Sequence, residues 1–190
     1  MKLSRILLIT IFAAIAAGLM IFPQIPMFGG FMKLDFSIIP IIIILYVLNL
    51  KDAFWVLLLR SVLELIINGD LSSLIGMPMN IVAVISFIFA IWCLQREITN
   101  FALKKFILGG IVGTFLLTIT MIILNIVYAL PLYEKVINFK LANLGMDTKE
   151  WILLMTLPFN LIQGILWTSF SALVLTMLQP IIYSQKIKYK

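Results

Sequence analysis

The chain has 190 residues, of which 63% are hydrophobic and only 12% are Asp, Glu, Lys or Arg. A soluble domain is about 45–50% apolar and about 25% charged, so a soluble globular protein and a disordered one are both excluded. The net charge of +6 comes from basic residues scattered over short loops, a pattern that does not indicate nucleic-acid binding. With no histidine and one cysteine, Cys93, the sequence also excludes an intrachain disulfide, the usual zinc sites and a His-based catalytic triad.

The first apolar run follows Lys2 and Arg5 and extends over residues 6–22. A signal peptide has a similar basic start, and the small residues at 13–17 resemble a cleavage site. The apolar run continues past them to Phe22, however, and the rest of the chain is itself apolar. We therefore predict a first transmembrane helix that the mature protein keeps.

Six apolar segments predict an all-α integral membrane bundle of six transmembrane helices. Their approximate bounds are 6–22, 38–50, 53–67, 79–94, 106–130 and 151–183. The second and third are short, and only Lys51 and Asp52 separate them, so the alternative is a single merged helix and five spans. Six spans place nine Lys and Arg on one side and four on the other, whereas five spans give five against seven. The positive-inside bias thus favours six helices with both termini cytoplasmic, in one membrane domain over residues 1–190.

The last segment is longer than a bilayer core and contains two prolines. Pro158 is expected to kink or restart its helix, and Gln179-Pro180 predicts a second bend near the cytoplasmic end.

The outer loop, residues 23–37, has the composition of a lid over a ligand. Two prolines stiffen its start, Gly29 and Gly30 provide a pivot, and three aromatic side chains stand at the interface with water: Phe28, Phe31 and Phe36. The alternative is a re-entrant turn whose aromatic side chains anchor at the membrane surface.

Polar side chains inside the apolar segments are the main candidates for ligand binding, because each is costly in hydrocarbon. Asn125 lies deep in the fifth segment, and Asn160 and Gln163 share a helix face just after Pro158. Uncharged amides both donate and accept hydrogen bonds, which suits a neutral, flat ligand with an amide-like edge. The alternative is ordinary interhelical hydrogen bonding, worth about 0.6 kcal/mol.

The turn at residues 76–80 is predicted to open the fourth helix. Pro78 fits a first helical turn, and free N–H groups near Asn80 are then able to meet a ligand hydroxyl. An ordinary connection has the same composition. In the third segment Arg60 and Glu64 are four residues apart, a spacing that allows them to pair on one face. Such a pair is more often structural, or extended toward the membrane interface, than catalytic.

The first helix contains overlapping patterns of small residues. Ala13 with Ala17, or Ala14 with Gly18, lets a second helix approach closely, either for internal packing or for docking of a partner. The chain has no GxxxxGK[ST] phosphate loop, so active transport by it requires energy from another subunit.

Together these segments resemble the riboflavin-specific substrate-binding subunit (S component) of energy-coupling factor (ECF) transporters. The resemblance covers nearly the whole chain and rests on four motifs: KLDFS at 33–37, the turn at 76–80, Asn125 followed by LPLY at 130–133, and PFNLIQG at 158–164. It implies a non-enzymatic, multi-pass subunit of the bacterial plasma membrane that captures riboflavin on the outer side. A transmembrane coupling subunit and two cytoplasmic ATPases then complete transport, with riboflavin as substrate and with no cofactor or metal.

The resemblance also implies roles for individual residues. The small residues of the first helix that face the coupling subunit correspond to Ala13 and Ala17, and the amides that contact the isoalloxazine ring correspond to Asn125 and Asn160. Gln163 stands where the family commonly has Lys, so a hydrogen bond to a flavin carbonyl is kept but the charge is lost. The candidate riboflavin-binding residues are Asn125, Asn160, Gln163, Asn80, Lys33 and Asp35.

Three other functions stay open on the sequence. One is an S component for a different vitamin. Another is an intramembrane protease or lipid hydrolase, which the absence of histidine and of paired carboxylates disfavours. The third is an assembly factor that binds no small molecule.

Overall fold

The computed structural model describes residues 3–28, 32–96 and 101–189, so Gly29, Gly30 and Phe31 of the predicted lid lie outside it. Two short strands, β1 (Ile25–Met27) and β2 (Met32–Leu34), accompany the helices. The helices are α1 (Leu3–Ile21), α2 (Ile38–Val47), α3 (Leu50–Ile67), α4 (Leu71–Leu94), α5 (Leu103–Leu124), α6 (Leu130–Ile137), α7 (Thr148–Trp151) and α8 (Leu157–Tyr189). A 3₁₀ turn, Leu141–Leu144, lies between α6 and α7.

Two π-helical turns join four of the eight helices end to end in pairs, so the bundle consists of six rods. Asn125–Ala129 joins α5 to α6, and Ile152–Thr156 joins α7 to α8. Four rods are long and apolar enough to cross a membrane: Leu3–Ile21, Leu71–Leu94, Leu103–Ile137 and Thr148–Ile182. The prediction of a six-helix membrane bundle is confirmed, with the second and third segments as separate helices.

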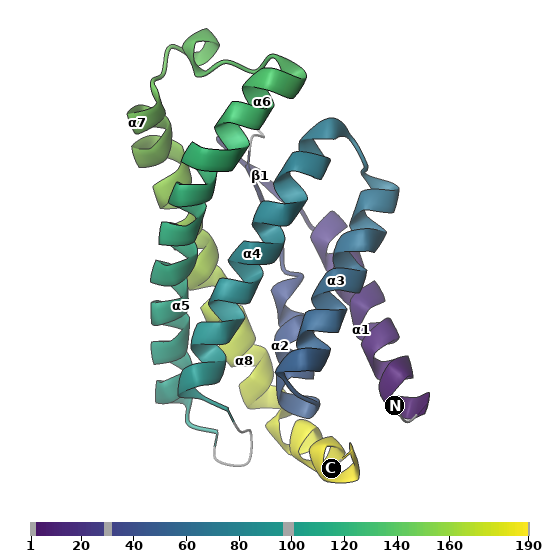
Figure 1. Cartoon of the computed structure of the whole chain (residues 1–190). Helices are drawn as coiled ribbons and strands as arrows, with labels where there is room; N and C mark the ends of the chain where they lie inside the picture. Colours follow the sequence, from purple (N-terminus) through teal and green to yellow (C-terminus); the bar gives the residue numbers. More distant parts are fainter. Residues whose placement is uncertain (1–2, 29–31, 97–100, 190) are drawn as a thin grey trace.

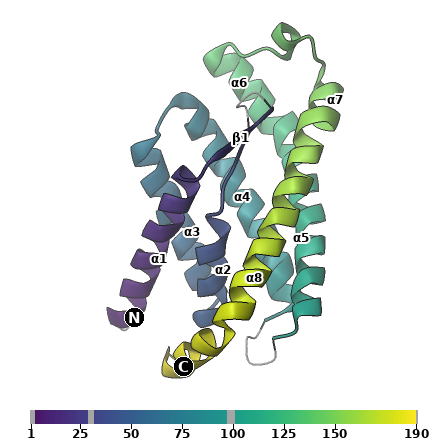
Figure 2. The ribbon, with the colours of Figure 1, turned by 180° about the vertical axis from the view of Figure 1, so that it is seen from behind.

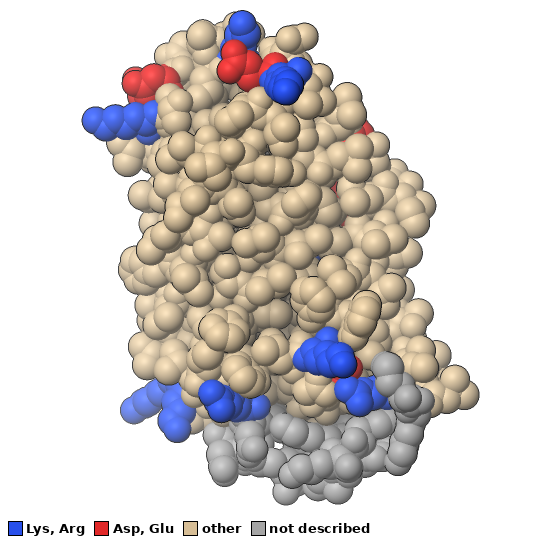
Figure 3. Space-filling model, viewed as in Figure 1, with Lys and Arg blue, Asp and Glu red and all other residues tan. Residues whose placement is uncertain are grey.

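The rods run side by side, with the chain ends at one end of the bundle and α6 and α7 at the other (Figure 1). On the face shown in Figure 3, charged side chains gather mostly at these two ends, and a broad uncharged belt separates them. This distribution is what a hydrocarbon slab around the middle of the bundle requires.

The short helix α2 is the centre of the core. Eight of its ten residues are buried, on every side of the helix, as expected for a helix that is apolar all round. It packs against α1, α3 and α8, and α8 passes beside it in the view from behind (Figure 2). Its shortness is tolerated because protein, rather than lipid, surrounds it.

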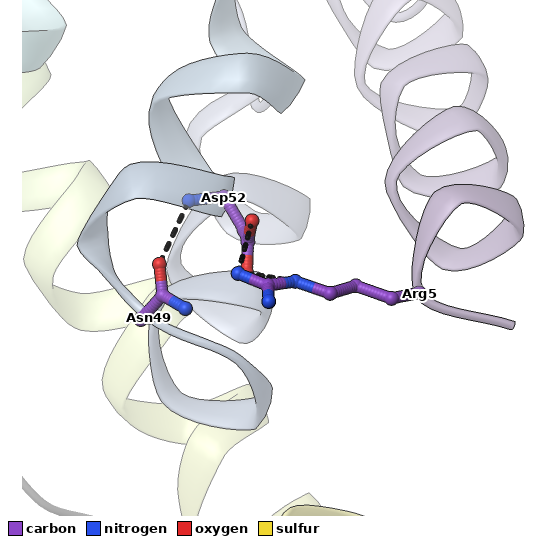
Figure 4. A network of polar contacts seen from close by, with 3 residues as sticks. All are labelled: Arg5, Asn49 and Asp52. Atoms are coloured by element: carbon purple, nitrogen blue, oxygen red, sulfur yellow. Dashed lines mark hydrogen bonds and ion pairs between the residues drawn. The ribbon is translucent and has the colours of Figure 1, made fainter. Parts of the chain in front are cut away.

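The junction of α2 and α3 is fastened by a polar network at the end of the bundle where the chain begins (Figure 4). Asn49 caps α3 by accepting a hydrogen bond from the backbone N–H of Asp52 at 3.0 Å. The Arg5 guanidinium of α1 donates to both oxygens of the buried Asp52 carboxylate, at 2.7–3.0 Å. Lys51 and Asp52 thus lie in the first turn of α3. The negative charge of Asp52 there also interacts favourably with the helix dipole.

Glycines bring α5 unusually close to α4. An added Cβ on Gly109 would lie 3.0 Å from the Ile91 Cα, and one on Gly113 would lie 3.0 Å from the Phe87 ring. The two glycines are four residues apart, the spacing of a GxxxG helix contact.

A second close approach joins α5 to α8 through a reciprocal pair of contacts. Gly110 of α5 faces Thr168 of α8, and Gly164 of α8 faces Thr114 of α5. Each threonine hydroxyl donates to a carbonyl four residues earlier on its own helix, at 2.7 Å. The hydroxyls are thus satisfied within their own helices, and only small groups stand between the two backbones.

The expected start of the fourth helix is wrong. The helix begins at Leu71, where Asp70 accepts a hydrogen bond from the backbone N–H of Ser73 at 2.6 Å and caps it. This cap starts the helix before Pro78, which lies exposed in its interior. The N–H groups of residues 76–80 are therefore not the unsatisfied donors of a first turn.

The structure also shows the outer loop and the two prolines of the last segment. The outer loop forms an antiparallel hairpin in which Ile25 pairs with Leu34, a structure that the sequence did not indicate. Pro158 is the second residue of α8 and follows the π turn, in line with a restarted helix. At the other proline, α8 continues through Pro180.

Candidate functional site

A cavity of about 380 Å³ lies among the hairpin, α3, α4, the α5–α6 rod and the α7–α8 rod. Its volume is within the range of small-molecule sites. All six residues predicted to bind a ligand line it: Lys33, Asp35, Asn80, Asn125, Asn160 and Gln163. They come from the hairpin and from three different rods, so the fold brings together side chains that are far apart in the sequence.

Asn125 stands where the α-helical pattern of α5 gives way to the π turn. Its Nδ2 donates to the Met121 carbonyl at 2.8 Å, and its Oδ1 accepts from the Trp151 indole N–H at 3.2 Å. These contacts fix which way the amide faces. They leave one N–H and one acceptor lone pair for a ligand.

Asn160 has one end tied to the protein and the other without a partner. Its Nδ2 donates to the Thr156 carbonyl at 2.6 Å, whereas its buried Oδ1 has no hydrogen-bond partner in the described part of the chain. An unpartnered buried acceptor costs about 1–3 kcal/mol. A ligand that donates a hydrogen bond here relieves that cost. Gln163, one turn further along α8, is also buried and lines the same cavity.

Aromatic side chains form part of the apolar wall of the cavity, together with methionines. Tyr133, Phe139, Trp151 and Phe159 all line it. Flat side chains of this kind bury large areas against a flat ring, in stacked or edge-to-face contact. Tyr133 and Phe159 lie within the LPLY and PFNLIQG motifs, but none of the four was predicted to bind the ligand, because an aromatic residue among many other apolar residues does not by itself indicate a site.

Asp35 follows β2 and is buried at the base of the hairpin. Its carboxylate accepts hydrogen bonds from the backbone N–H of Ser37, at 2.8 Å, and from the Ser37 hydroxyl. Burial raises the pKa of the Asp35 carboxyl, while the positive charge of Arg60 and the Ser37 hydrogen bonds act in the opposite direction. The Asp35 carbonyl also accepts from the Trp167 indole N–H at 2.9 Å, which holds this loop against α8.

Three more charged groups stand around the cavity. Glu64 and Asp70 line it together with Lys33, although neither carboxylate was predicted to bind a ligand. Hydrogen bonds from Ser73, chiefly from its backbone N–H, hold the pKa of Asp70 below its usual value, so this carboxylate stays charged. Three carboxyl groups, those of Asp35, Glu64 and Asp70, thus lie at the cavity together with the Lys33 ammonium group.

The spacing of Arg60 and Glu64 allows an ion pair, but the structure does not form one. Among the described residues no ion pair joins them, and Oε2 of Glu64 has no hydrogen-bond partner. The guanidinium instead donates to Ser37, Met20 and Asn80, because its side chain extends toward α1 and α4 rather than along α3.

The assignment of partner docking to Ala13 and Ala17 also needs correction. These residues are 1% and 4% exposed and pack inside the bundle, where α1 contacts α2 and α3. The exposed small residues of α1 are Ala14 and Gly18, and nothing lies within 4 Å of an added Cβ on Gly18.

Comparison with known proteins identifies the family. The family model described as "ECF transporter, substrate-specific component" matches residues 4–178. The chain belongs to this family. It is therefore a multi-pass protein of the bacterial cell membrane.

Relatives with assigned names are similar over most of their length. The riboflavin transporter RibU of Leuconostoc mesenteroides is 39% identical over 95% of this chain and 93% of its own. RibU of Streptococcus thermophilus is 41% identical over 85% of this chain and 75% of its own. The riboflavin transporter FmnP of Bacillus subtilis is 29% identical over 98% of this chain and 97% of its own.

A solved structure shares the fold. It is described as the S component of a bacterial ECF transporter, and it aligns with a TM-score of 0.77 over 96% of this chain and 99% of its own. At 24% identity the likeness concerns the fold alone.

Proposed function

We propose that this chain is the riboflavin-binding subunit of an ATP-driven ECF transporter. The observation that carries the proposal is that six polar side chains, picked from the sequence, line a single cavity within an apolar bundle. The relatives named as riboflavin transporters support the same substrate.

The chemistry of the cavity matches the edge of the flavin ring. That edge presents an imide N–H between two carbonyl groups. The unpartnered Oδ1 of Asn160 accepts from the imide N–H, and the amide groups of Asn125 and Gln163 donate to the carbonyls. The aromatic side chains hold the ring plane. A ligand that lacks this pattern leaves the buried amides unpaired, which is a strong source of selectivity.

The outer loop, which the structure describes at residues 23–28 and 32–37, acts as the lid of this site. Its members Gln24, Met32, Lys33 and Asp35 line the cavity, so riboflavin has to pass beside them. We place this end of the bundle on the outer side of the membrane and both termini in the cytoplasm. The excess of Lys and Arg at the end that holds the termini supports this orientation.

Delivery inward requires a transmembrane coupling subunit and two cytoplasmic ATPases, because the chain has no phosphate loop of its own. The exposed pair Ala14 and Gly18 offers the coupling subunit a close helix contact. Gly18→Leu is expected to abolish riboflavin uptake by cells while flavin binding to the purified subunit is unchanged, because Gly18 is exposed and no atom of the described chain lies within 4 Å of an added Cβ. The control is Val112→Leu, at an exposed position of α5. Loss of binding in Gly18→Leu, or normal uptake, would contradict this docking surface.

The decisive experiment is an absorption and fluorescence spectrum of the detergent-purified protein, with riboflavin titrated into any empty fraction. A stoichiometric yellow ligand, or saturable quenching of flavin fluorescence, is the expected result. A colourless protein that does not respond to riboflavin would refute the substrate and leave an S component for another vitamin.

A further inference from the structure

Arg60 of α3 is a fully buried guanidinium that stands behind the cavity wall. It is 0% exposed and is not one of the residues that line the cavity. Within the described residues it forms no ion pair. Burying a charge without a directly paired counter-charge is costly, so the contacts that Arg60 does make are the place to look for its role.

Those contacts reach three elements that surround the ligand site. One terminal nitrogen donates to the Ser37 hydroxyl at 2.6 Å and contacts the Met20 sulfur at 2.9 Å. The other donates to Oδ1 of Asn80 at 2.7 Å. Met20 lies in the last turn of α1, Ser37 lies at the base of the hairpin, and Asn80 lies in α4. Met20 and Asn80 line the cavity.

The contact with Asn80 determines what that amide offers to a ligand. A guanidinium has donors only, so the atom of Asn80 that faces it must be the oxygen. The amide nitrogen is thereby turned away from Arg60, and in the described part of the chain it has no hydrogen-bond acceptor. Asn80 therefore presents two N–H donors at the cavity wall.

The contact with Ser37 determines a second group. Because its hydroxyl oxygen accepts from Arg60, the hydroxyl proton is directed to the Asp35 carboxylate, which lines the cavity. One guanidinium thus orients a donor on α4 and, through Ser37, an acceptor at the base of the hairpin. A donor and an acceptor close together suit hydroxyl groups, each of which both accepts and donates.

We propose that Arg60 is a positioning residue that orients Asn80 and, through Ser37, Asp35 to hold the hydroxylated chain of the ligand. This inference rests on riboflavin as the ligand. It places the ring at Asn125, Asn160 and Gln163, and the ribityl chain at the wall that Arg60 supports.

Comparing the binding of two flavins distinguishes this role from general support of the fold. Lumiflavin has the same ring as riboflavin, with a methyl group in place of the ribityl chain. Arg60→Met is expected to weaken riboflavin binding by about 10- to 100-fold, the effect of one or two unmade hydrogen bonds, and to change lumiflavin binding by less than about threefold. Arg60→Lys keeps the positive charge but has a single donating group. It is expected to weaken riboflavin binding by less than Arg60→Met does.

The matched control is Arg5→Met, which removes the other arginine held in a polar network, at the far end of the bundle. It is expected to leave the ratio of the riboflavin and lumiflavin dissociation constants unchanged. An equal loss of both flavins in Arg60→Met would overturn the proposal, because it would mean that Arg60 only supports the fold.

If Arg60→Met does not fold, Asn80→Asp decides the question. Aspartate keeps an oxygen facing Arg60 but replaces the N–H donors with a second acceptor. Selective loss of riboflavin over lumiflavin is expected, and an unchanged ratio would overturn the proposal. If the unaltered protein binds neither flavin, the proposed substrate itself fails, a result distinct from either of these.

Discussion

The close contact between α5 and α8 can be tested at Gly164. Gly164 is one turn beyond Asn160, and it faces Thr114, which is three turns before Asn125 on α5. The spacing of these two helices therefore fixes the distance between the two amides of the proposed ring site. We predict that Gly164→Ala destabilises the bundle and weakens flavin binding together.

The size of the effect follows from the geometry. The added Cβ would lie 2.7 Å from the Thr114 Cβ, whereas ordinary contacts begin at 3.4 Å. The shortfall of about 0.7 Å has to be met by moving the helices apart, since a Cβ atom cannot rotate away. Overpacking of this kind costs about 1–3 kcal/mol. For a chain of this size that corresponds to a fall of about 2–12 °C in Tm.

The reference for this measurement is Gly18→Ala, because Gly18 has open space around it and both changes add the same helix propensity. Thermal unfolding in one detergent compares the two variants, and riboflavin titration measures the site. Adding Thr114→Gly to Gly164→Ala is expected to recover part of the loss, as a positive coupling in a double-mutant cycle. Equal Tm values for Gly164→Ala and Gly18→Ala, with unchanged affinity, would refute the packing argument.

Three further changes have defined outcomes. Asn160→Leu is expected to cost about 1–3 kcal/mol of riboflavin affinity, measured by fluorescence quenching against the exposed control Ile162→Ala; equal affinities would remove Asn160 from the site. Asp52→Asn is expected to lower Tm by a few degrees without altering affinity, because it weakens the Arg5 contact far from the cavity; a change in affinity would contradict that separation. Ala13→Leu is expected to lower Tm by overpacking the buried face of α1, and normal stability would show that this face is not packed.

The helices could be predicted because their signal is composition itself. Each rod is an apolar stretch bounded by charge or by a turn, and polar side chains in such stretches are few. Asn125, Asn160 and Gln163 could therefore be picked out without knowing which helices are neighbours. Their meeting in one cavity follows from tertiary packing, which the spacing along the chain does not reveal.

Competition between two local helix-start signals explains why α4 does not begin where the sequence predicts. Pro78 favours a first turn, and the prediction gave it that position. Asp70 is also a strong helix cap, and the observed helix follows the cap because an exposed proline can remain in a helix at the cost of one hydrogen bond. The GxxxG spacing of Gly109 and Gly113, at the contact of α5 with α4, is also present in the sequence.

The error at Ala13 and Ala17 has a different cause. Residues 13 and 14 point about 100° apart around a helix, and α1 is apolar on every side, so hydrophobicity does not distinguish its inner face from its outer one. Only the packing of α1 against α2 and α3 decides that Ala13 is inside and Ala14 outside. A pattern of small residues indicates that a helix approaches closely there, but not which helix.

The polar contacts behind the cavity determine what each amide presents to a ligand. Asn160 donates an amide N–H to a backbone carbonyl, which leaves its oxygen for a ligand, whereas Asn80 accepts from Arg60 through its oxygen, which leaves its N–H groups for a ligand. The same residue type thus becomes an acceptor at one wall and a donor at the other. A sequence motif specifies only that an amide is present. The direction in which it faces is set by partners such as Thr156 and Arg60, so substitutions at those supporting positions are expected to change which ligand is preferred even where every lining residue is kept.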